Sequence, residues 1–284
     1  MSKHVTDETA LYGSEAADIY AAFRAMPTST SVADDFNAMR AVQQAVGGRN
    51  GVRVVDLGCG PGLRTREIAE LAGVTTVLGI DHSHEQLGLA HAEPVPGNCR
   101  FAFGDLGALG QGRRGWAGGA VEIEDLLGSF DVAFTGFVTS HAATQAELDA
   151  MLRAAAAFLR PGGRLVVIDA HPRLDTAPFP PCDQYGVGKT VLAPAGHGGV
   201  IPAFTPIRIT FITPKGALTV EDYFHDVASW SAAAAAAGLR GLVVEDFSAP
   251  PTGEPGFWDA YITPDHPAGC SQAAVIRAVK PDRR

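Results

Sequence analysis

The sequence lacks runs of basic residues, long apolar stretches and paired cysteines. Its 22 Lys and Arg are outnumbered by 31 Asp and Glu, which leaves a net charge of −9. A protein that binds nucleic acid by neutralising phosphates usually has the opposite balance. No apolar stretch reaches the roughly 18 residues needed to cross a bilayer. We therefore expect neither nucleic acid nor a membrane as a partner.

Cysteine usage gives no sign of a metal site or of a disulfide framework. The four cysteines, none in a CxxC pair or at zinc-binding spacing from a histidine, are Cys59, Cys99, Cys182 and Cys270. We expect buried or half-buried free thiols in a reducing compartment, and no bound metal. The N-terminal segment lacks the apolar core of a signal peptide, which favours a cytoplasmic location.

Short β-branched runs alternate with helical patterns along most of the chain. The predicted strands cover residues 52–57, 75–80, 99–103, 130–135, 164–168, 242–244 and 273–279. The helices predicted between them cover residues 63–71, 84–92, 145–159 and 227–237. This alternation predicts an α/β fold: a Rossmann-like, doubly wound, mostly parallel sheet of about seven strands.

We interpret residues 1–284 as a single domain. Its expected parts are an N-terminal helical cover (1–50), a cofactor-binding core (51–170), a substrate-covering flap (172–225) and the C-terminal part of the core (226–284). The flap segment is rich in proline and glycine and has strand-like runs at 189–192 and 207–212, which is typical of an antiparallel lid. The glycine-rich stretch 107–129 is expected to be a surface insertion, and its Arg113 and Arg114 are expected to be solvated.

A glycine-rich turn follows the first predicted strand of the core. Gly58 and Gly60 in this turn let a ligand approach the backbone, and the following helix presents free N–H groups. Asp81 ends the next strand, where such folds place a carboxylate on the ribose hydroxyls of a nucleotide. Together these residues predict a cofactor that contains a nucleoside.

The turn is poorly suited to a dinucleotide. The dinucleotide pattern G-x-G-x-x-G needs a third glycine where this chain has Leu63, because Gly62 comes one position early. Pro61 also removes an N–H group that would otherwise meet a pyrophosphate. Two alternatives stay open here: a nicotinamide-dependent oxidoreductase on a similar sheet, and a non-catalytic cofactor-binding protein or fold member recruited to a different role.

Five segments, in order along the chain, resemble the motifs of class I S-adenosylmethionine-dependent methyltransferases. They are VVDLGCGPG (54–62), GIDHS (79–83), FGDL (103–106), FDVAF (130–134) and LRPGGRL (159–165). The resemblance implies S-adenosyl-L-methionine as cofactor and methyl transfer to an N, O or C atom of a small molecule. The acidic surface agrees with a small-molecule substrate and leaves the oligomeric state open, a homodimer included.

The resemblance also implies which residues hold the cofactor. They are Tyr20, Asp56, Gly58, Gly60, Asp81, His82, Asp105, Leu106, Phe137 and Val138. In this interpretation Asp56 lies below the amino group, Asp81 holds the ribose hydroxyls beside His82, and Asp105 and Leu106 contact the adenine.

The same interpretation assigns roles to the other predicted cofactor-binding residues. Gly58 and Gly60 carry the methionine portion, Phe137 and Val138 lie near the sulfonium, and Tyr20 closes over the cofactor. Carboxylates and aromatic faces suit a positively charged sulfur.

Each acidic candidate also fits a purely local role. Asp56 and Asp105 are typical turn residues, and Asp81 is in a position to cap the following helix. Tyr20 fits equally well as a packing residue of an amphipathic helix.

A narrower resemblance, to toxoflavin synthase-like methyltransferases, indicates specialised-metabolite biosynthesis. The segments that carry it are QYG (184–186), 207–213, TVEDYF (219–224) and FW (257–258). The chain departs from that group in the 107–129 insertion and at Ser140-His141, where the group tends to have Asn-Tyr.

Methyl transfer needs a general base only if the acceptor carries a proton of high pKa. His141 follows the fourth predicted strand, and Asp169 and His171 follow the fifth, so all three face the crevice at the carboxyl edge of the sheet. We predict these three as the catalytic candidates, with His141 first because it replaces the tyrosine. Three further polar residues in the flap are candidates to reach inward: Glu221, Asp222 and His225.

Overall fold

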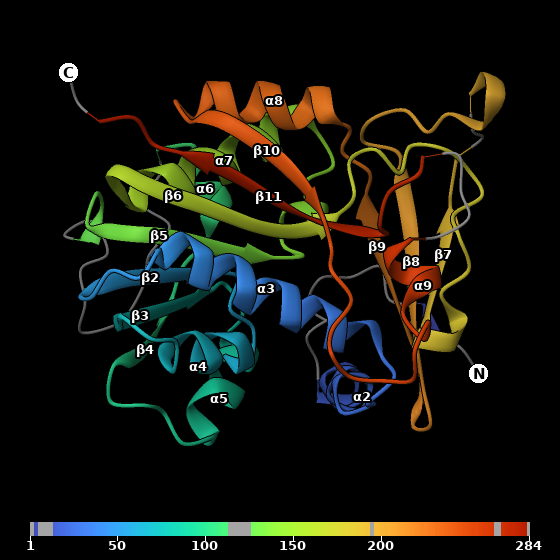
Figure 1. Ribbon diagram of the computed structural model, residues 1–284, viewed down its shortest axis with the longest axis horizontal. Helices are drawn as coiled ribbons and strands as arrows, with labels where there is room; N and C mark the ends of the chain where they lie inside the picture. Colours follow the sequence, from blue (N-terminus) through green and yellow to red (C-terminus); the bar gives the residue numbers. More distant parts are fainter. Residues whose placement is uncertain (1–2, 5–13, 113–125, 194–195, 264–267, 283–284) are drawn as a thin grey trace.

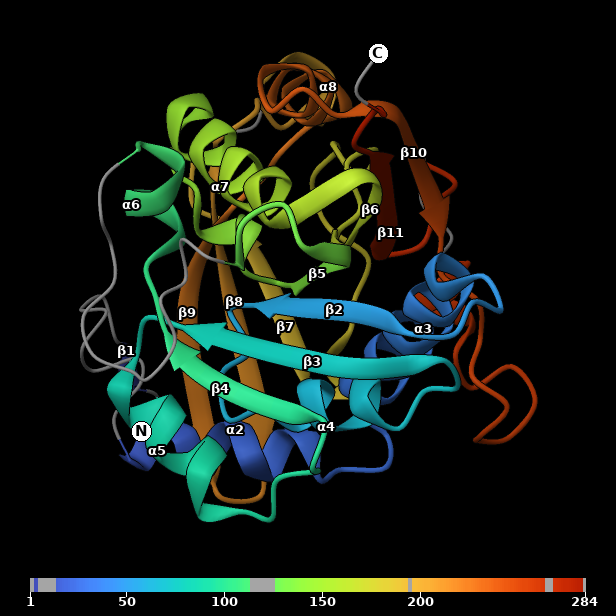
Figure 2. The ribbon, with the colours of Figure 1, turned by 90° about the vertical axis from the view of Figure 1, so that its left-hand side faces the viewer.

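The computed structural model describes residues 3–4, 14–112, 126–193, 196–263 and 268–282. Its larger sheet has seven strands, which lie in the order β10-β11-β6-β5-β2-β3-β4 (Figures 1 and 2). Their bounds in that order are Arg240–Asp246, Ala273–Val279, Leu159–Ala170, Phe130–Gly136, Val52–Leu57, Val74–Asp81 and Cys99–Phe103. Arg113 and Arg114, predicted to be solvated, lie outside the described residues.

The sheet is mostly parallel, as the sequence predicts. Strands β6, β5, β2, β3 and β4 run parallel to one another, whereas β11 is antiparallel to both β6 and β10. Strand β3, which follows β2 in the chain, lies on one side of β2, and β5, which comes later, lies on its other side. The carboxyl ends of β2 and β5 therefore flank the topological switch point, where sheets of this kind bind ligands.

Helices cover both faces of this sheet and bury two separate cores. One face packs against α3 (Thr30–Val46) and α4 (Leu63–Ala69), and the other packs against α7 (Gln145–Phe158) and α8 (Val227–Ala236). The two groups of helices lie on opposite sides of the sheet in Figure 2. The smaller helices are α2 (Ser14–Arg24), α5 (His84–Ala92), α6 (Leu106–Gly110), α9 (Asp259–Ile262), η2 (Thr139–His141), η3 (Asp183–Tyr185) and η4 (His197–Gly199).

Local signals in the sequence account for several helix boundaries. The Thr144 side chain accepts the N–H of Glu147, and the Glu147 carboxylate accepts the N–H of Thr144, so a capping box starts α7. Gly47 ends α3 with a φ of 65°, a left-handed conformation that glycine adopts without strain. Helix α4 ends at Ala69, two residues before the predicted Leu71.

A second, antiparallel sheet stands beyond the carboxyl ends of β5 and β6 (Figure 1). Its long strands are β7 (Val187–Val191), β8 (Pro206–Thr213) and β9 (Gly216–Tyr223), and β1 (Lys3–His4) pairs in parallel with β9. The strands predicted at 189–192 and 207–212 are thus present and antiparallel, with bounds shifted by one or two residues, and the substrate-covering role of the flap stays a prediction. The sequence analysis did not predict β9 or β1.

Side chains alternate between the two faces of the flap, as in any β-sheet. One face turns toward the core and contributes to the two cavities described below; its members are Val187, Lys189, Ile207, Ile209, Phe211, Leu218, Val220 and Asp222. Within the part of the chain that the structure describes, no helix combines the length and the apolarity that crossing a membrane requires.

Candidate active site

Two neighbouring cavities lie between the carboxyl edge of the larger sheet and the flap. The first has a volume of about 220 Å³ and is lined at the switch point by the turn after β2 and the loop after β5. The second has a volume of about 110 Å³ and is lined by the flap, the end of β6 and the N-terminal helices. Four of the described residues line both: Tyr20, Phe137, Phe211 and Asp222. The cavities therefore share a wall.

The glycine turn forms the floor of the first cavity. Gly58 and Gly60 adopt positive φ values of 73° and 53°, which favour glycine. A Cβ atom on Gly58 would collide with the side chain of Val138, because the turn approaches the loop after β5 closely. Gly60 has open space beside it, with Gln86 3.8 Å away from the position of a Cβ atom. The turn thus exposes bare backbone to the cavity, as the sequence predicts.

Asp56 ends β2 and lines the first cavity while being almost fully buried. Its carboxylate accepts a hydrogen bond from the Thr65 hydroxyl on α4 at 2.6 Å. Burial raises the pKa of Asp56 to about 6, although the Thr65 bond and the nearby Arg64 act against the shift. Asp56 is thus a buried acid that a cationic amino group would help to ionise.

Asp81 ends β3 beside the same turn. Its two carboxylate oxygens accept the backbone N–H groups of Gly60 at 2.7 Å and Ser83 at 2.9 Å. The alternative that Asp81 caps the next helix is wrong, because the Ser83 hydroxyl accepts the N–H of Gln86 and is the N-cap of α5. Asp81 therefore links the glycine turn to the loop after β3. It also lines the cavity, and its carboxylate oxygens can accept further hydrogen bonds there.

Of the three residues predicted to lie near the adenine, only His82 lines the first cavity. His82 lines the first cavity with a half-exposed ring. Asp105 and Leu106 do not contribute to the cavity lining: Asp105 is exposed and caps α6 by accepting the N–H of Ala108 at 3.1 Å. Leu106 packs against the α7 side of the sheet.

Aromatic side chains gather where the two cavities meet. Phe137 follows β5 with a φ of 58°, which is unusual for a residue other than glycine. Tyr20 on α2 and Phe211 on β8 meet edge to face, with ring centroids 5.3 Å apart. Val138 lines the first cavity only. Tyr20, Phe137 and Val138, which the sequence analysis assigns to the cofactor, thus all line the first cavity.

Arg64 is a residue of the first cavity that the sequence analysis missed. It lies on α4, with its guanidinium carbon 5.7 Å from the centre of the Phe137 ring. Its Nε donates to Asp35 at 2.7 Å, and the same carboxylate accepts from Arg24 at 2.7 Å. A buried guanidinium at this position is a candidate to hold a carboxylate.

His141 points toward the shared wall. It belongs to η2, directly after β5, and its ring lines the first cavity. Its Nδ1 lies 3.2 Å from Oδ1 of Asp222 on the flap strand β9. The first catalytic candidate is thus joined to a flap residue that lines both cavities.

Asp169 and His225 form a second polar group nearby. Asp169 ends β6, is 2% exposed, lines the second cavity and accepts a short hydrogen bond from the Thr139 hydroxyl. Burial raises the pKa of Asp169, and the charge of Asp222 adds to this effect. His225 donates from Nε2 to the Ala142 carbonyl at 2.8 Å, so its ring is fixed by the backbone.

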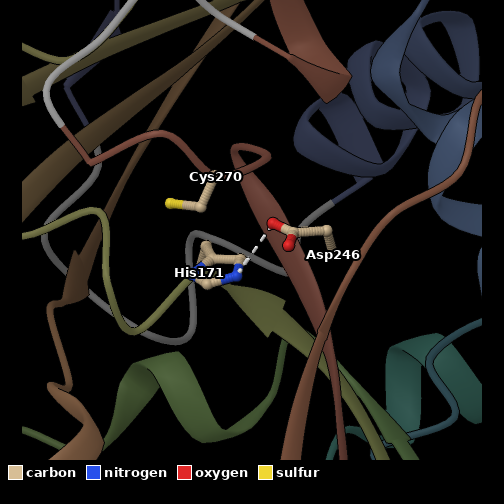
Figure 3. A group of neighbouring side chains, drawn as sticks. All are labelled: His171, Asp246 and Cys270. Atoms are coloured by element: carbon tan, nitrogen blue, oxygen red, sulfur yellow. Dashed lines mark ion pairs between the residues drawn. The ribbon is translucent and has the colours of Figure 1, made fainter.

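His171 lies farther from the shared wall, in a cluster with Asp246 and Cys270 (Figure 3). The His171 ring is fully buried and lines the second cavity, and its Nε2 lies 3.2 Å from Oδ1 of Asp246. No sequence signal predicted this cluster, because its members come from three segments that are far apart in the chain.

The donor set of this cluster does not fit a metal ion. Nδ1 of His171 accepts the backbone N–H of Arg173 at 3.1 Å, so the ring proton sits on Nε2, which faces the carboxylate. Burial raises the pKa of the Cys270 thiol to about 11, which disfavours a thiolate ligand. The cluster is better explained as a buried neutral histidine held against an acid. All four cysteines are free and buried, which confirms that part of the prediction.

We expect His171 to make the fold sensitive to acid. Burial lowers the pKa of His171 to about 4, below its usual 6.5. A depressed histidine pKa stabilises the fold above pH 6.5, and this contribution is lost as the pH falls from 6.5 toward 4. Urea unfolding at pH 7 and pH 5 should show a loss of about 1–3 kcal/mol. His171→Gln should reduce the difference in unfolding free energy between the two pH values. An equally large difference in the variant would show that His171 is not its source.

Comparison with known proteins points to methyltransferases. Residues 54–163 match a sequence family described as a methyltransferase domain. The chain is 26% identical to N-demethylindolmycin N-methyltransferase from Streptomyces griseus, over 71% of this chain and 75% of that protein. It is 36% identical to trans-aconitate 2-methyltransferase from Deinococcus radiodurans over 45% of this chain and 42% of that protein.

A solved structure with a similar fold comes from Micromonospora echinaspora. It is an amino pentose methyltransferase with bound S-adenosylmethionine, 19% identical, with a TM-score of 0.52. The match covers 98% of this chain and 99% of that protein. At this identity the likeness shows a shared fold.

Proposed function

This protein is a class I S-adenosylmethionine-dependent methyltransferase, and we propose that it methylates an N, O or C atom of a small molecule in specialised-metabolite biosynthesis. When bound, S-adenosyl-L-methionine supplies an electrophilic methyl group on a positively charged sulfur. The protein has to hold the cofactor, align the acceptor and exclude water. We propose that residues 1–284 act as one unit, because helices, core and flap all line the two cavities.

The observation that carries this proposal is the second cavity. It shares a wall with the first, and it is closed by the flap and lined mainly by apolar side chains. Such a cavity suits a molecule of modest size, buried on most sides with a few polar contacts. A polymer such as nucleic acid would need an open, basic groove instead.

The residues of the first cavity fit the cofactor in chemistry. We propose that the turn at Gly58 and Gly60 carries its amino-acid portion, with Asp56 for the amino group and Arg64 for the carboxylate. Asp81 would accept the ribose hydroxyls, and His82 would lie beside the adenine.

We also propose places for the remaining predicted residues. Tyr20, Phe137 and Val138 would surround the sulfur, where aromatic faces favour positive charge. Asp105 and Leu106 stay candidates for the adenine only if the loop after β4 closes over it.

We propose roles for the three catalytic candidates in binding the methyl acceptor and removing its proton. His141 lies where the two cavities meet and can accept a proton if the acceptor carries one. Asp169 and His171 line the second cavity, where they would orient the substrate rather than reach the methyl group. The relatives' names support a small acceptor, since they name N-demethylindolmycin and trans-aconitate. The likeness to toxoflavin synthase-like enzymes stays a prediction.

Two measurements test the proposed function. Calorimetric titration should show binding of S-adenosylhomocysteine and none of NADPH, which a nicotinamide-dependent enzyme would reverse. Cofactor with a labelled methyl group, incubated with the protein and a metabolite extract, should transfer its label to small molecules. Label that appears only in nucleic acid or protein fractions would contradict a small-molecule acceptor.

A further inference from the structure

The wall shared by the two cavities carries the negative charge of a carboxylate. This charge indicates which chemical class of methyl acceptor would bind there. Among the residues that line both cavities, Tyr20, Phe137 and Phe211 are aromatic, and Asp222 contributes a carboxylate. We propose that the acceptor is an amine nitrogen on an apolar, ring-bearing molecule, and that Asp222 binds it in its ammonium form. This inference rests on the proposed function and narrows it from N, O or C to N.

Asp222 is placed for this role by the pleat of β9. Leu218, Val220 and Asp222 alternate along one face of the strand and all line the first cavity, so Asp222 faces inward. Its Oδ1 is shielded from solvent and faces His141. Glu221, the next residue, belongs to the opposite face and lines neither cavity.

The surrounding charges leave the wall negative. Asp34 and Asp169 add two further buried carboxyl groups to the second cavity. Lys189, the cation of that cavity, lies on β7, which is separated from β9 by β8, and its ammonium donates to the side-chain oxygen of Gln272 at 3.3 Å. The two arginines of the first cavity, Arg24 and Arg64, both pair with Asp35. An ammonium group would be attracted to this wall, whereas a carboxylate acceptor would be repelled.

The apolar lining of the second cavity indicates what the rest of the substrate, beyond its amine nitrogen, is like. This lining includes Phe23, Leu174, Phe179, Ile207, Ile209 and Phe224. These aliphatic and aromatic surfaces would bury a flat ring system, and the aromatic residues of the shared wall would contact the cationic nitrogen. A molecule that is polar over its whole surface would bury part of that surface against these apolar side chains without hydrogen-bond partners.

The proton balance is consistent with the residues present. An ammonium group has to release one proton before its nitrogen has a free electron pair, and Asp222 with His141 would receive that proton. The nitrogen pair then forms the N–C bond while the S–C bond breaks and its electron pair stays on sulfur. The positive charge passes from sulfur to nitrogen, so the product is a methylated ammonium.

A carboxylate at this wall would also suit the positive sulfur of the cofactor, and binding experiments separate the two roles. With S-adenosylhomocysteine bound, the sulfur is neutral. The probes are 2-phenylethylamine, 2-phenylethanol and 3-phenylpropanoate, which share a ring and differ in the charge of the end group. Ligand-observed NMR on the protein saturated with S-adenosylhomocysteine gives their dissociation constants without any turnover.

We expect 2-phenylethylamine to bind at least about tenfold more tightly than the other two probes. Asp222→Asn should remove this preference and leave S-adenosylhomocysteine affinity nearly unchanged. The matched control Glu221→Gln changes a neighbouring carboxylate on the opposite face and should keep the preference. Equal or weaker binding of the amine, absence of binding included, would overturn the proposal, and so would an undiminished preference in Asp222→Asn.

The labelled-methyl assay distinguishes failure of this inference from failure of the proposed function. Its small-molecule products are passed over a cation exchanger at a pH where amines are charged. Label retained on the exchanger supports an amine acceptor. Label confined to the unretained fraction overturns the amine while leaving a small-molecule methyltransferase in place. No labelled small molecule in either fraction contradicts the proposed function itself.

Discussion

Asp81→Ala should weaken the binding of S-adenosylmethionine and S-adenosylhomocysteine by about ten- to hundredfold. A ribose hydroxyl that donates to a carboxylate forms a charge-assisted hydrogen bond, and the loss of this contact costs about 1.5–3 kcal/mol in total. The Asp81 carboxylate also accepts the N–H groups of Gly60 and Ser83, so its loss loosens the turn that carries the cofactor. Isothermal titration of both molecules measures the effect.

A second variant separates the ribose contact from the support of the turn. Asp81→Asn keeps the size of the side chain and one good acceptor oxygen, but it loses the negative charge. We expect an intermediate loss of affinity, with an unfolding midpoint close to that of the unchanged protein. If Asp81→Ala binds the cofactor as tightly as the unchanged protein, the assignment of Asp81 to the ribose is wrong.

The parts of the site that lie in one sequence segment could be predicted from the sequence. The turn at Gly58 and Gly60 follows a strand of buried β-branched residues, and Asp81 ends the next one, so their positions follow from the parallel sheet. The predicted bounds of β2 and β11 agree with the structure residue for residue. In these places local propensity and long-range packing favour the same structure.

The parts that depend on contacts between distant segments could not be predicted. Strand β9 carries Glu221 and Asp222 near its end, and charged residues are depleted in strands, so the strand signal in its sequence is weak. Its position opposite His141 depends on how the flap folds back onto the core. The contact of His171 with Asp246 likewise joins the end of β6 to the end of β10. Sequence spacing carries no information on such contacts.

Asp105 illustrates a different limit of sequence reasoning. The motif around it is shared with the family, but in the structure its carboxylate caps α6 and is exposed. A motif identifies a position in the fold, while the direction of a side chain also depends on the loop that follows. Here that loop leads into residues 113–125, which lie outside the described part of the chain.

His141→Ala should lower turnover by about 10²–10⁴-fold while cofactor affinity stays nearly unchanged. The physical reason is position: η2 follows β5 directly, and the ring lies in the first cavity near Asp222, at the shared wall where we propose that methyl transfer takes place. The carboxylate of Asp222 orients the imidazole and stabilises the charge that the ring gains when it takes up a proton. Steady-state kinetics with the identified acceptor, together with titration of S-adenosylhomocysteine, measure the two quantities separately.

His141→Gln distinguishes proton removal from positioning. Glutamine keeps a side chain that can hydrogen-bond to Asp222, but it cannot take up a proton. If His141 is the base, the glutamine variant should be nearly as slow as the alanine variant. Turnover of the unchanged enzyme should also fall in acid as the imidazole is protonated, and this fall should disappear in the glutamine variant. Full activity of His141→Gln would show that the residue only positions the substrate. The proton would then have to leave through Asp222 or directly to water, as an amine of low pKa allows.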